Sequence, residues 1–421
     1  MKTSIFPLKP VAFAVLTALA ALPAVAAADD LSQLRKTVET LQKQLQEVQK
    51  QLEEQQAQAK TEQPASRADV EQLQKQVSEA NEWREPNTLV HLAGYADVGY
   101  EKTQGNNDDG SFTVGRFSPI FHFQYRDLVM LESELEFEVE DDGNTNTSLE
   151  YLTIDLFMND YATLVAGKFL SPVGQFRQNL HPSWVNKMAS APPGFGHDGA
   201  APVSDVGVQV RGGLPRMGGV RTNYALFVSN GPELSSEDGE LEGIDAEGFN
   251  KDAEGNKVYG GRVGILPIPN LEIGLSGAWG EAAVSKIDGN EVDINDEGKR
   301  DYKVYDADFN YQLGSLGVRG EYVKSKVGST SKGLAASGSA NWTTWYTQAA
   351  YKFLPTKWEA VARYTDFDSA VDDRDVKQWA LGINYIFTSN FIAKVNYELN
   401  DGKNNSAADD NRFLAQLAYG F

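Results

Sequence analysis

The sequence contains no cysteine among its 421 residues. Without thiols the chain cannot form disulfides, thiolate zinc sites or iron–sulfur clusters, and it has no cysteine nucleophile. Long apolar runs are also missing: no stretch after residue 30 stays apolar for 18 residues, which excludes retained membrane-spanning helices. Basic residues are few, 38 against 59 acidic ones, and the net charge of −21 argues against nucleic acid as a partner.

Sequence motifs of common enzymes are missing as well. No GxSxG, HExxH or Walker pattern occurs, and the four histidines stand in no hydrolase spacing. The acidic loops contain no EF-hand spacing. We therefore predict that the protein is not an enzyme and has no cofactor and no metal site. An outer-membrane enzyme stays open as an alternative, and a hydrolase activity lost with one histidine would favour it.

The first 28 residues are typical of an export signal. Lys2 and Lys9 precede the apolar run Val11–Leu22, and small residues at 24–28 offer a cleavage site. The run is too short to span a membrane comfortably. We expect the mature chain to begin near Asp29 and to leave the cytoplasm.

Residues 29–86 predict an oligomerising coiled coil. Apolar residues recur there at alternating spacings of three and four, which is a heptad seam. A helix with one narrow apolar stripe needs a partner, so we expect copies of this chain to associate, and a solvated spacer helix is the alternative. Pro64 interrupts the pattern, and the seam does not fix the number of helices. The seam residues are Leu31, Leu34, Val38, Leu41, Leu45, Val48 and Leu52.

From Leu89 onward the apolar period changes to two, which predicts β-strands. We count sixteen of them, and their connections alternate between short turns and long loops. This layout is typical of an outer-membrane barrel with short periplasmic turns. The predicted fold is all-β: a 16-stranded antiparallel transmembrane β-barrel over residues 87–421, preceded by the periplasmic coiled coil. The predicted strands are 89–101, 112–126, 128–139, 148–158, 160–170, 204–213, 219–230, 257–267, 270–283, 300–314, 316–327, 341–354, 357–367, 377–388, 390–400 and 411–421.

The last strand is predicted to carry a recognition signal for the barrel-assembly machinery. Phe413, Leu417 and Tyr419 alternate with other residues, and the sequence ends at Phe421. Such an ending resembles the C-terminal signal of outer-membrane barrels. Aromatic residues near strand ends, Tyr95 among them, predict two girdles at the membrane interfaces.

Alternation also predicts which side chains line the interior of the barrel. Taking the apolar parity of each strand as outward leaves charges of both signs inside, which requires water. A slip of one residue would reverse any single assignment. The predicted inward cations include Arg116, Lys168, Arg211, Arg319 and Arg363. An acidic row on one strand comprises Glu132, Glu134, Glu136 and Glu138.

The connection 171–203 is predicted to fold into the barrel as a constriction. It is long, and its apolar residues, such as Phe176, Trp184 and Phe195, need burial. Arg177 and Lys187 with one Asp make it mildly basic, and His181 adds a neutral donor. The next long connection, 231–256, carries nine acids and one Lys. A basic constriction behind an acidic rim favours anions.

Three segments resemble a known family. GKFLSPVGQF at 167–176, HPSW at 181–184 and VSDVGVQVRG at 203–212 are similar to a strand, the constriction loop and the next strand of the phosphate-selective porin O/P-like family. The N-terminal heptads before a 16-stranded barrel are similar to those of DcaP-type porins. The resemblance implies trimers that pass phosphate or dicarboxylates. The lumen arginines do not match the family pattern residue by residue.

We therefore expect a homotrimeric porin for passive diffusion of small anions, with outer-membrane lipid and lipopolysaccharide around it. The alternatives are a general or cation-preferring porin, or a structural tether that acts through its coiled coil. The acidic row and the net charge favour a cation preference. The residues expected to attract anions are Arg177, Lys187, His181, Arg116, Lys168, Arg211, Arg319 and Arg363.

Deleting residues 31–82 separates a channel from a tether. If the barrel is a porin, the shortened protein keeps its conductance in planar bilayers, because no pore-lining residue lies in that segment. A tether would instead give no channel activity in either form.

Overall fold

The computed structural model describes residues 88–421, apart from 105–109, 197–198, 253–254, 334, 336–337 and 404–405. The predicted export signal and the heptad seam lie outside the described residues. The chain divides into two compact units, Met1–Glu85 and Pro86–Phe421. All the described elements belong to the second unit.

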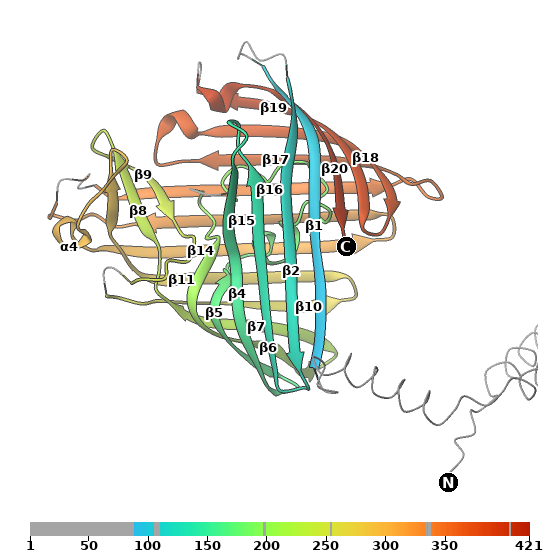
Figure 1. Cartoon of the computed structure of the whole chain (residues 1–421), viewed down its shortest axis with the longest axis horizontal. Helices are drawn as coiled ribbons and strands as arrows, with labels where there is room; N and C mark the ends of the chain where they lie inside the picture. Colours follow the sequence, from blue (N-terminus) through green and yellow to red (C-terminus); the bar gives the residue numbers. More distant parts are fainter. Residues whose placement is uncertain are drawn as a thin grey trace, which may run out of the picture. The chain divides into compact units, whose positions relative to one another are not determined.

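Sixteen strands of this unit close into one antiparallel barrel, which confirms the predicted fold (Figure 1). Each strand pairs with the next one of the barrel, and β20 pairs with β1. The strands are β1 (Thr88–Thr103), β2 (Ser111–Tyr125), β3 (Val129–Val139), β4 (Thr145–Asn159), β5 (Ala162–Leu170), β6 (Ser204–Met217), β7 (Val220–Ser229), β10 (Val258–Ile268), β11 (Leu271–Ala282), β14 (Arg300–Leu313), β15 (Leu316–Val327), β16 (Ala340–Lys352), β17 (Trp358–Asp368), β18 (Val376–Thr388), β19 (Phe391–Gly402) and β20 (Arg412–Gly420).

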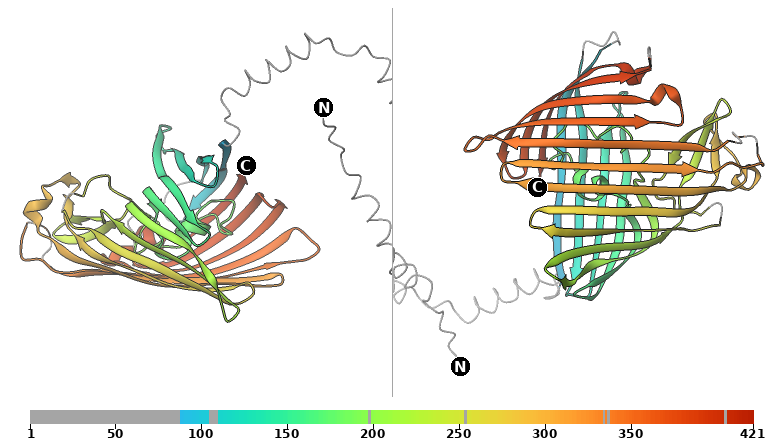
Figure 2. Two further views of the ribbon diagram at one scale, coloured as in Figure 1. Left: turned by 90° about the horizontal axis from the view of Figure 1, so that it is seen from below. Right: turned by 180° about the vertical axis from the view of Figure 1, so that it is seen from behind.

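Short turns gather at one end of the barrel and long loops at the other, which we call the short-turn end and the long-loop end. The barrel closes where β1 pairs with β20 over Tyr95–Thr103, and the backbones of Gly94 and Phe421 exchange two hydrogen bonds of 2.9 and 3.0 Å at the end of this pairing. Strands β1–β5 form one wall, and strands β10–β19 form the opposite wall, seen from behind in Figure 2. Full closure leaves the paired strands without open edges, which a membrane-spanning sheet requires.

Two of the long loops contain a second sheet that the sequence patterns did not indicate. Its order is β13-β12-β8-β9, and β8 pairs with β12 in parallel, so the connections 230–257 and 283–299 hold each other. None of the described helices is long and apolar enough to cross a membrane. The additional elements are β8 (Glu233–Glu237), β9 (Glu240–Asp245), β12 (Val284–Ile287), β13 (Asn290–Glu291), α4 (Ile294–Glu297), and the short turns η1 (Phe176–Leu180), η2 (Asp372–Arg374) and η3 (Ala407–Asp409).

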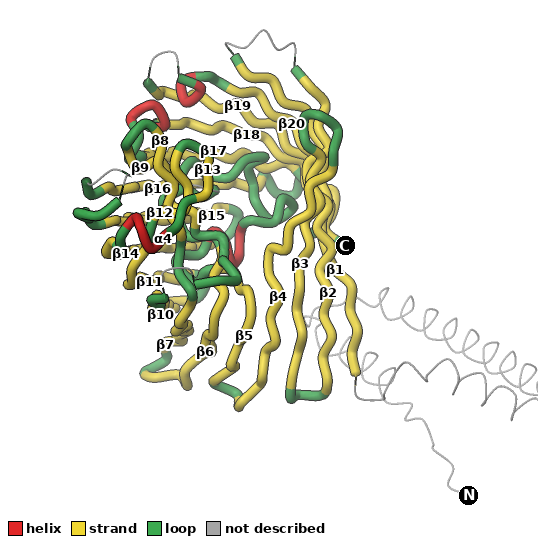
Figure 3. The backbone as a smooth tube through the Cα atoms, turned by 60° about the vertical axis from the view of Figure 1, so that its left-hand side comes forward, coloured by secondary structure: helices red, strands yellow, loops and turns green. Residues whose placement is uncertain are grey.

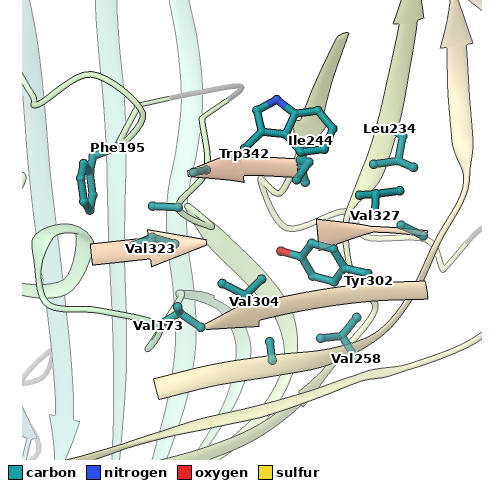
Figure 4. Packing of buried hydrophobic residues seen from close by; sticks show 14 of the residues in the cluster. Val173, Phe195, Leu234, Ile244, Val258, Tyr302, Val304, Val323, Val327 and Trp342 are labelled. Atoms are coloured by element: carbon teal, nitrogen blue, oxygen red, sulfur yellow. The ribbon is translucent and has the colours of Figure 1, made fainter. Parts of the chain in front are cut away.

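Loop segments occupy much of the space between the walls, as the green tube in Figure 3 shows. A contiguous apolar cluster forms there from the third loop, the loop sheet and the inward faces of β14, β15 and β16 (Figure 4). Trp342 and Phe195 within it are fully buried. The long-loop half of this interior is therefore packed like a protein core rather than lined by polar groups.

This core reverses the predicted parity of β5. Val165 and Phe169 belong to the interior cluster, so the inward positions of β5 are odd-numbered. Lys168 has the other parity and pairs with Leu152, which is exposed on the outside, and with Val206. The prediction that Lys168 lines the interior is wrong, because the rule of apolar side chains facing outward fails where the lumen contains its own apolar core.

Tyr95 is a second correction. It was expected in an interfacial girdle, but its ring is 1% exposed inside the barrel, and its hydroxyl donates to Glu134 at 2.8 Å. By contrast, the exposed rings of Tyr305, Tyr322 and Trp345 lie on the outward face of the far wall. The side chains of Phe413, Leu417, Tyr419 and Phe421 are also exposed.

Two tryptophans of β16 test the interior core. Replacing Trp342 by Ala should lower the free energy of unfolding by about 3–5 kcal/mol, because a fully buried aromatic ring is lost. The temperature at which the folded band disappears in denaturing gel electrophoresis measures the loss. Trp345→Ala removes the same ring from the outward face and is the control. A larger loss for Trp345→Ala than for Trp342→Ala would contradict an apolar interior.

Candidate functional site

The third long loop, residues 171–203, enters the barrel and is hydrogen-bonded to its walls from the first turn. The backbone N–H of Gly174 donates to Ser276 Oγ at 2.9 Å. The N–H groups of Gln175 and Phe176 both donate to Glu321 Oε2, at 3.2 and 2.9 Å. Gly174 has φ +77°, and a Cβ there would lie 1.9 Å from Glu321 Oε1, so only glycine fits. Glu321 of β15 thus fixes the entry of the loop.

The middle of the loop crosses toward β1, β3 and β20. His181 Nδ1 contacts the carbonyl of Arg177, and its Nε2 lies 3.9 Å from Glu134 Oε2. The ring of Trp184 lies against Gly420, where a Cβ would come within 2.8 Å of the indole. The last strand, β20, therefore carries a glycine at the position where Trp184 of the third loop contacts it.

Two buried cations of the far wall hold the second half of the loop. Lys394 of β19 donates to the carbonyls of Ser183 and Met188 at 2.5 and 3.0 Å. Arg363 of β17 donates to the carbonyls of Ser190 and Ala191 at 2.9 and 3.2 Å. Both cations are 1% exposed.

Neutral side chains of neighbouring strands continue this series. Asn384 donates to the carbonyl of Lys187 at 2.9 Å, and Thr344 donates to that of Pro193 at 2.8 Å. Asn396 Oδ1 accepts from the N–H of Ala189 at 2.6 Å, and Ser325 donates to the carbonyl of Ala200 at 2.6 Å. A loop buried inside a barrel needs such partners, because backbone groups without hydrogen bonds are costly away from water.

This arrangement changes the roles of two predicted anion-binding residues. Arg363 points inward, but its Nη1 and Nη2 donate to the loop and to Gln378, and Glu398 lies 3.7 Å away. Arg177 is 6% exposed, and burial lowers the pKa of its guanidinium. The prediction that Arg363 and Arg177 meet a passing ion is wrong, because both side chains are enclosed by protein.

A cavity of about 350 Å³ remains between the third loop and the short-turn end of β14–β17. Three cations line it: Lys187 of the loop, Arg319 of β15 and Lys352 of β16. The one carboxylate in its lining, Glu359, lies 3.4 Å from Lys187 Nζ and also accepts from Asn384 at 3.2 Å. The lining also includes the amide side chains of Asn310, Gln312 and Gln348 and the small residues Gly314, Ser315 and Gly317.

Arg319 is the best-placed cation of this cavity. Its Nη2 and Nε lie 2.8 and 3.2 Å from the amide oxygen of Gln348 when that amide is oriented to accept. Among the described residues, Arg319 thus has a neutral hydrogen-bond partner and no ion pair. Lys352 was not predicted as a lumen residue, although it shares the even-numbered inward parity of Trp342 and Gln348. The aromatic rings at other inward positions of β16 obscured that signal.

Two further spaces lie on the other side of the loop, near the short-turn ends of β3–β7. Their volumes are about 250 and 420 Å³, and Gln178, Asn179 and Arg211 line both. Arg211 is bonded to Asp155 at 2.6 Å, and its side chain stays 44% exposed. Arg211 thus faces water with its charge paired.

The acidic row on β3 is largely occupied by partners. Glu132 lies 3.3 Å from His122 Nε2, and Glu134 accepts from Tyr95. Glu136 is buried beside Arg116, 3.4 Å from its Nη1. Glu138 is exposed at the long-loop end. Only Glu136 of this row lies beside a guanidinium, whereas Glu134 has a neutral hydroxyl partner that does not compensate its negative charge.

Acidic residues dominate the mouth at the long-loop end. A space of about 840 Å³ there is lined by Glu240, Asp372 and Asp373 against the single cation Lys403. In the described part of the chain, no group of three or more His, Asp or Glu side chains is arranged to hold a metal ion.

Comparisons with known proteins agree with this architecture. A sequence model of the family described as Gram-negative porin matches residues 15–405. The comparison with curated proteins gives no match. Among solved structures, an anion-selective porin from Comamonas acidovorans is 16% identical, with 79% of this chain and 100% of that chain covered and a TM-score of 0.55.

Two other solved structures have a similar fold. The outer membrane channel DcaP of Acinetobacter baumannii is 11% identical over 80% of this chain and 98% of its own, with a TM-score of 0.54. The trimer form of OmpT from Vibrio cholerae is 14% identical over 79% of this chain and 99% of its own, with a TM-score of 0.52. At these identities the likeness shows a shared fold.

Removing the buried anchors should loosen the third loop. In Arg363→Met or Lys394→Met, each loop carbonyl left without a donor costs about 1–3 kcal/mol of stability. We expect noisier single-channel currents in planar bilayers and a lower unfolding temperature than in the wild type. Arg221→Met, which removes an exposed cation from β7, is the matched control. Equal noise in the control and the anchor variants would show that the wall cations do not hold the loop.

Proposed function

Because the chain belongs to the Gram-negative porin family, whose members form outer-membrane channels, we propose that it is a homotrimeric porin for passive diffusion of small anions. The cavity lined by Lys187, Arg319 and Lys352 is the observation that carries the anion preference. The only carboxylate in that lining is already paired with Lys187 and Asn384. A net positive, partly enclosed space lowers the energy of an anion that enters it.

The proposed solutes are phosphate and small dicarboxylates. Arg319 offers a planar guanidinium that suits carboxylate or phosphate, and the two lysines add charge without fixed geometry. The neighbouring amides of Asn310, Gln312 and Gln348 can replace part of the hydration shell. Contacts of this kind are weak enough for the ion to leave, so transport follows the concentration gradient. The resemblance to phosphate-selective O/P-like porins and the fold shared with an anion-selective porin support this solute class.

The remaining parts of the chain fit the same proposal. Residues 1–28 direct export, and residues 29–86 form a periplasmic coiled coil that assists trimer assembly. The short turns then face the periplasm, and the long loops face the outside. The alternating residues Phe413, Leu417, Tyr419 and Phe421 of the last strand serve as the signal for barrel assembly. The trimer form of OmpT supports the oligomeric state.

A cation preference is the second candidate, and one observation favours it. The outer mouth is lined by Glu240, Asp372 and Asp373, which attract cations before they reach the interior. These acids lie in a wide, water-exposed space, where screening shortens their reach to about 10 Å at moderate salt. The narrower cavity beneath the loop should therefore decide the selectivity.

Charge reversal beneath the third loop tests the proposal. The double variant Arg319→Glu/Lys352→Glu should shift the reversal potential in a salt gradient from the anion side toward the cation side. Wild-type current should also fall when phosphate or succinate is added, and the variant should lose this block. Lys102→Glu/Lys377→Glu changes the net charge equally on exposed lysines of β1 and β18 and is the control.

The same recordings can reject the proposal. A wild-type reversal potential on the cation side would mean that the acidic mouth dominates. A shift of equal size in the control would mean that only the total charge of the protein matters.

A further inference from the structure

Three lysines gather on the outward face of two neighbouring strands near the long-loop end. Lys303 of β14 stands directly opposite Lys326 of β15 in the strand register. Lys324 of β15 pairs with Tyr305, two residues along the strands toward the middle of the barrel. All three share the outward parity of the exposed aromatic residues on these strands.

Like charges placed directly opposite each other in a sheet repel and destabilise it. One acid, Asp301, lies 2.9 Å from Lys303. Glu281 of β11 stands opposite Asp301 in the register and is hydrogen-bonded to Asn256. Within the described residues, no carboxylate lies within ion-pair distance of Lys324 or Lys326. The group therefore carries an excess of positive charge in a protein whose net charge is −21.

An aromatic platform lies beside and beneath the amines. Strand β14 lies between β11 and β15, and Lys303 pairs with Trp279 on the β11 side. Both Trp279 and Tyr305 are exposed. The amine of Lys326 lies 5.8 Å from the centre of the Tyr305 ring. Tyr322 and Trp345 pair with each other one row closer to the middle of the barrel. Exposed Tyr and Trp rings mark the depth of a membrane interface, so the lysines lie at headgroup level.

We propose that Lys303, Lys324 and Lys326 bind the phosphate of an anionic glycolipid in the outer leaflet, whose sugar rests on Trp279 and Tyr305. Charge complementarity selects this occupant, because the amines need an anion and the only solvent at that depth is lipid headgroup. The inference rests on the proposed orientation, with the long loops outside the cell. It does not depend on which ions pass through the pore.

The polar neighbours on the next strand fit a headgroup. Thr343 of β16 stands opposite Lys324, and Asn341 stands opposite Lys326. Both offer hydrogen bonds at the same depth as the amines. The surface therefore combines three cations, two neutral polar residues and two aromatic rings without crossing the apolar band below.

Lipid retention by the full-length protein in detergent tests the site. We would titrate diphosphoryl lipid A into the wild type and into Lys324→Gln/Lys326→Gln, and count bound lipid by native mass spectrometry. Loss of two ammonium contacts should weaken binding about 10- to 30-fold. Lys102→Gln/Lys377→Gln removes two exposed outward-parity lysines from other strands near the long-loop end and should bind like the wild type.

Four results would overturn the inference: equal binding by both variants, equal binding of a lipid A without phosphates, full competition by inorganic phosphate, or a change of oligomeric state in Lys324→Gln/Lys326→Gln. Reversal potentials recorded on the same samples keep this outcome separate from the anion proposal. The two lysines face outward, so the channel should be unchanged whether or not lipid binds.

Discussion

A peptide segment inside a barrel must find hydrogen bonds away from water, and this requirement organises the protein. The third loop meets this requirement through hydrogen bonds between its backbone and side chains of the barrel wall. These side chains are Glu321, Asn384, Lys394, Arg363 and Asn396. Charged side chains that alternation alone would place along a water-filled channel therefore hold the loop in position instead. Once the loop is fixed, its apolar residues pack against the loop sheet and the strands β14–β16, and the long-loop half of that interior becomes a core.

The fixed loop also separates the charges that remain. Lys187, Arg319 and Lys352 face one cavity toward the short-turn end, with one paired carboxylate. Arg211 lies on the other side, in an ion pair with Asp155, and the acids of β3 are occupied by Tyr95, His122 and Arg116. The mouth adds further negative charge, around Glu240 and Asp372. A strongly acidic protein can thus hold a cavity lined by three cations and one carboxylate beside its third loop.

Periodicity and loop lengths were enough to predict the sixteen strands, because each strand has one face toward lipid and a register that the alternation enforces. They were not enough to predict which side chains face the interior or what those side chains contact. The parity rule placed Lys168 inward, because it could not show that Val165 and Phe169 have an apolar core to face. It placed Arg363 beside water, because hydrogen bonds to a loop about 170 residues away in sequence leave no local pattern, and the basic composition of the loop could not show that Arg177 is buried. Lys352 was missed for the related reason that its inward neighbours are aromatic. The loop sheet was missed because β8 and β12 are short and pair across a long separation.

Hydrogen–deuterium exchange of the third loop tests this account most directly. The N–H groups of Gln175, Phe176 and Ala189 donate to wall carboxylate and amide groups, so peptides that contain them should exchange as slowly as peptides from β15 and β19. Peptides from the exposed turn η2 provide the fast reference. Rapid exchange throughout residues 174–190 would contradict the account, because a loop that opens freely could not hold the cavity of Lys187, Arg319 and Lys352 in place.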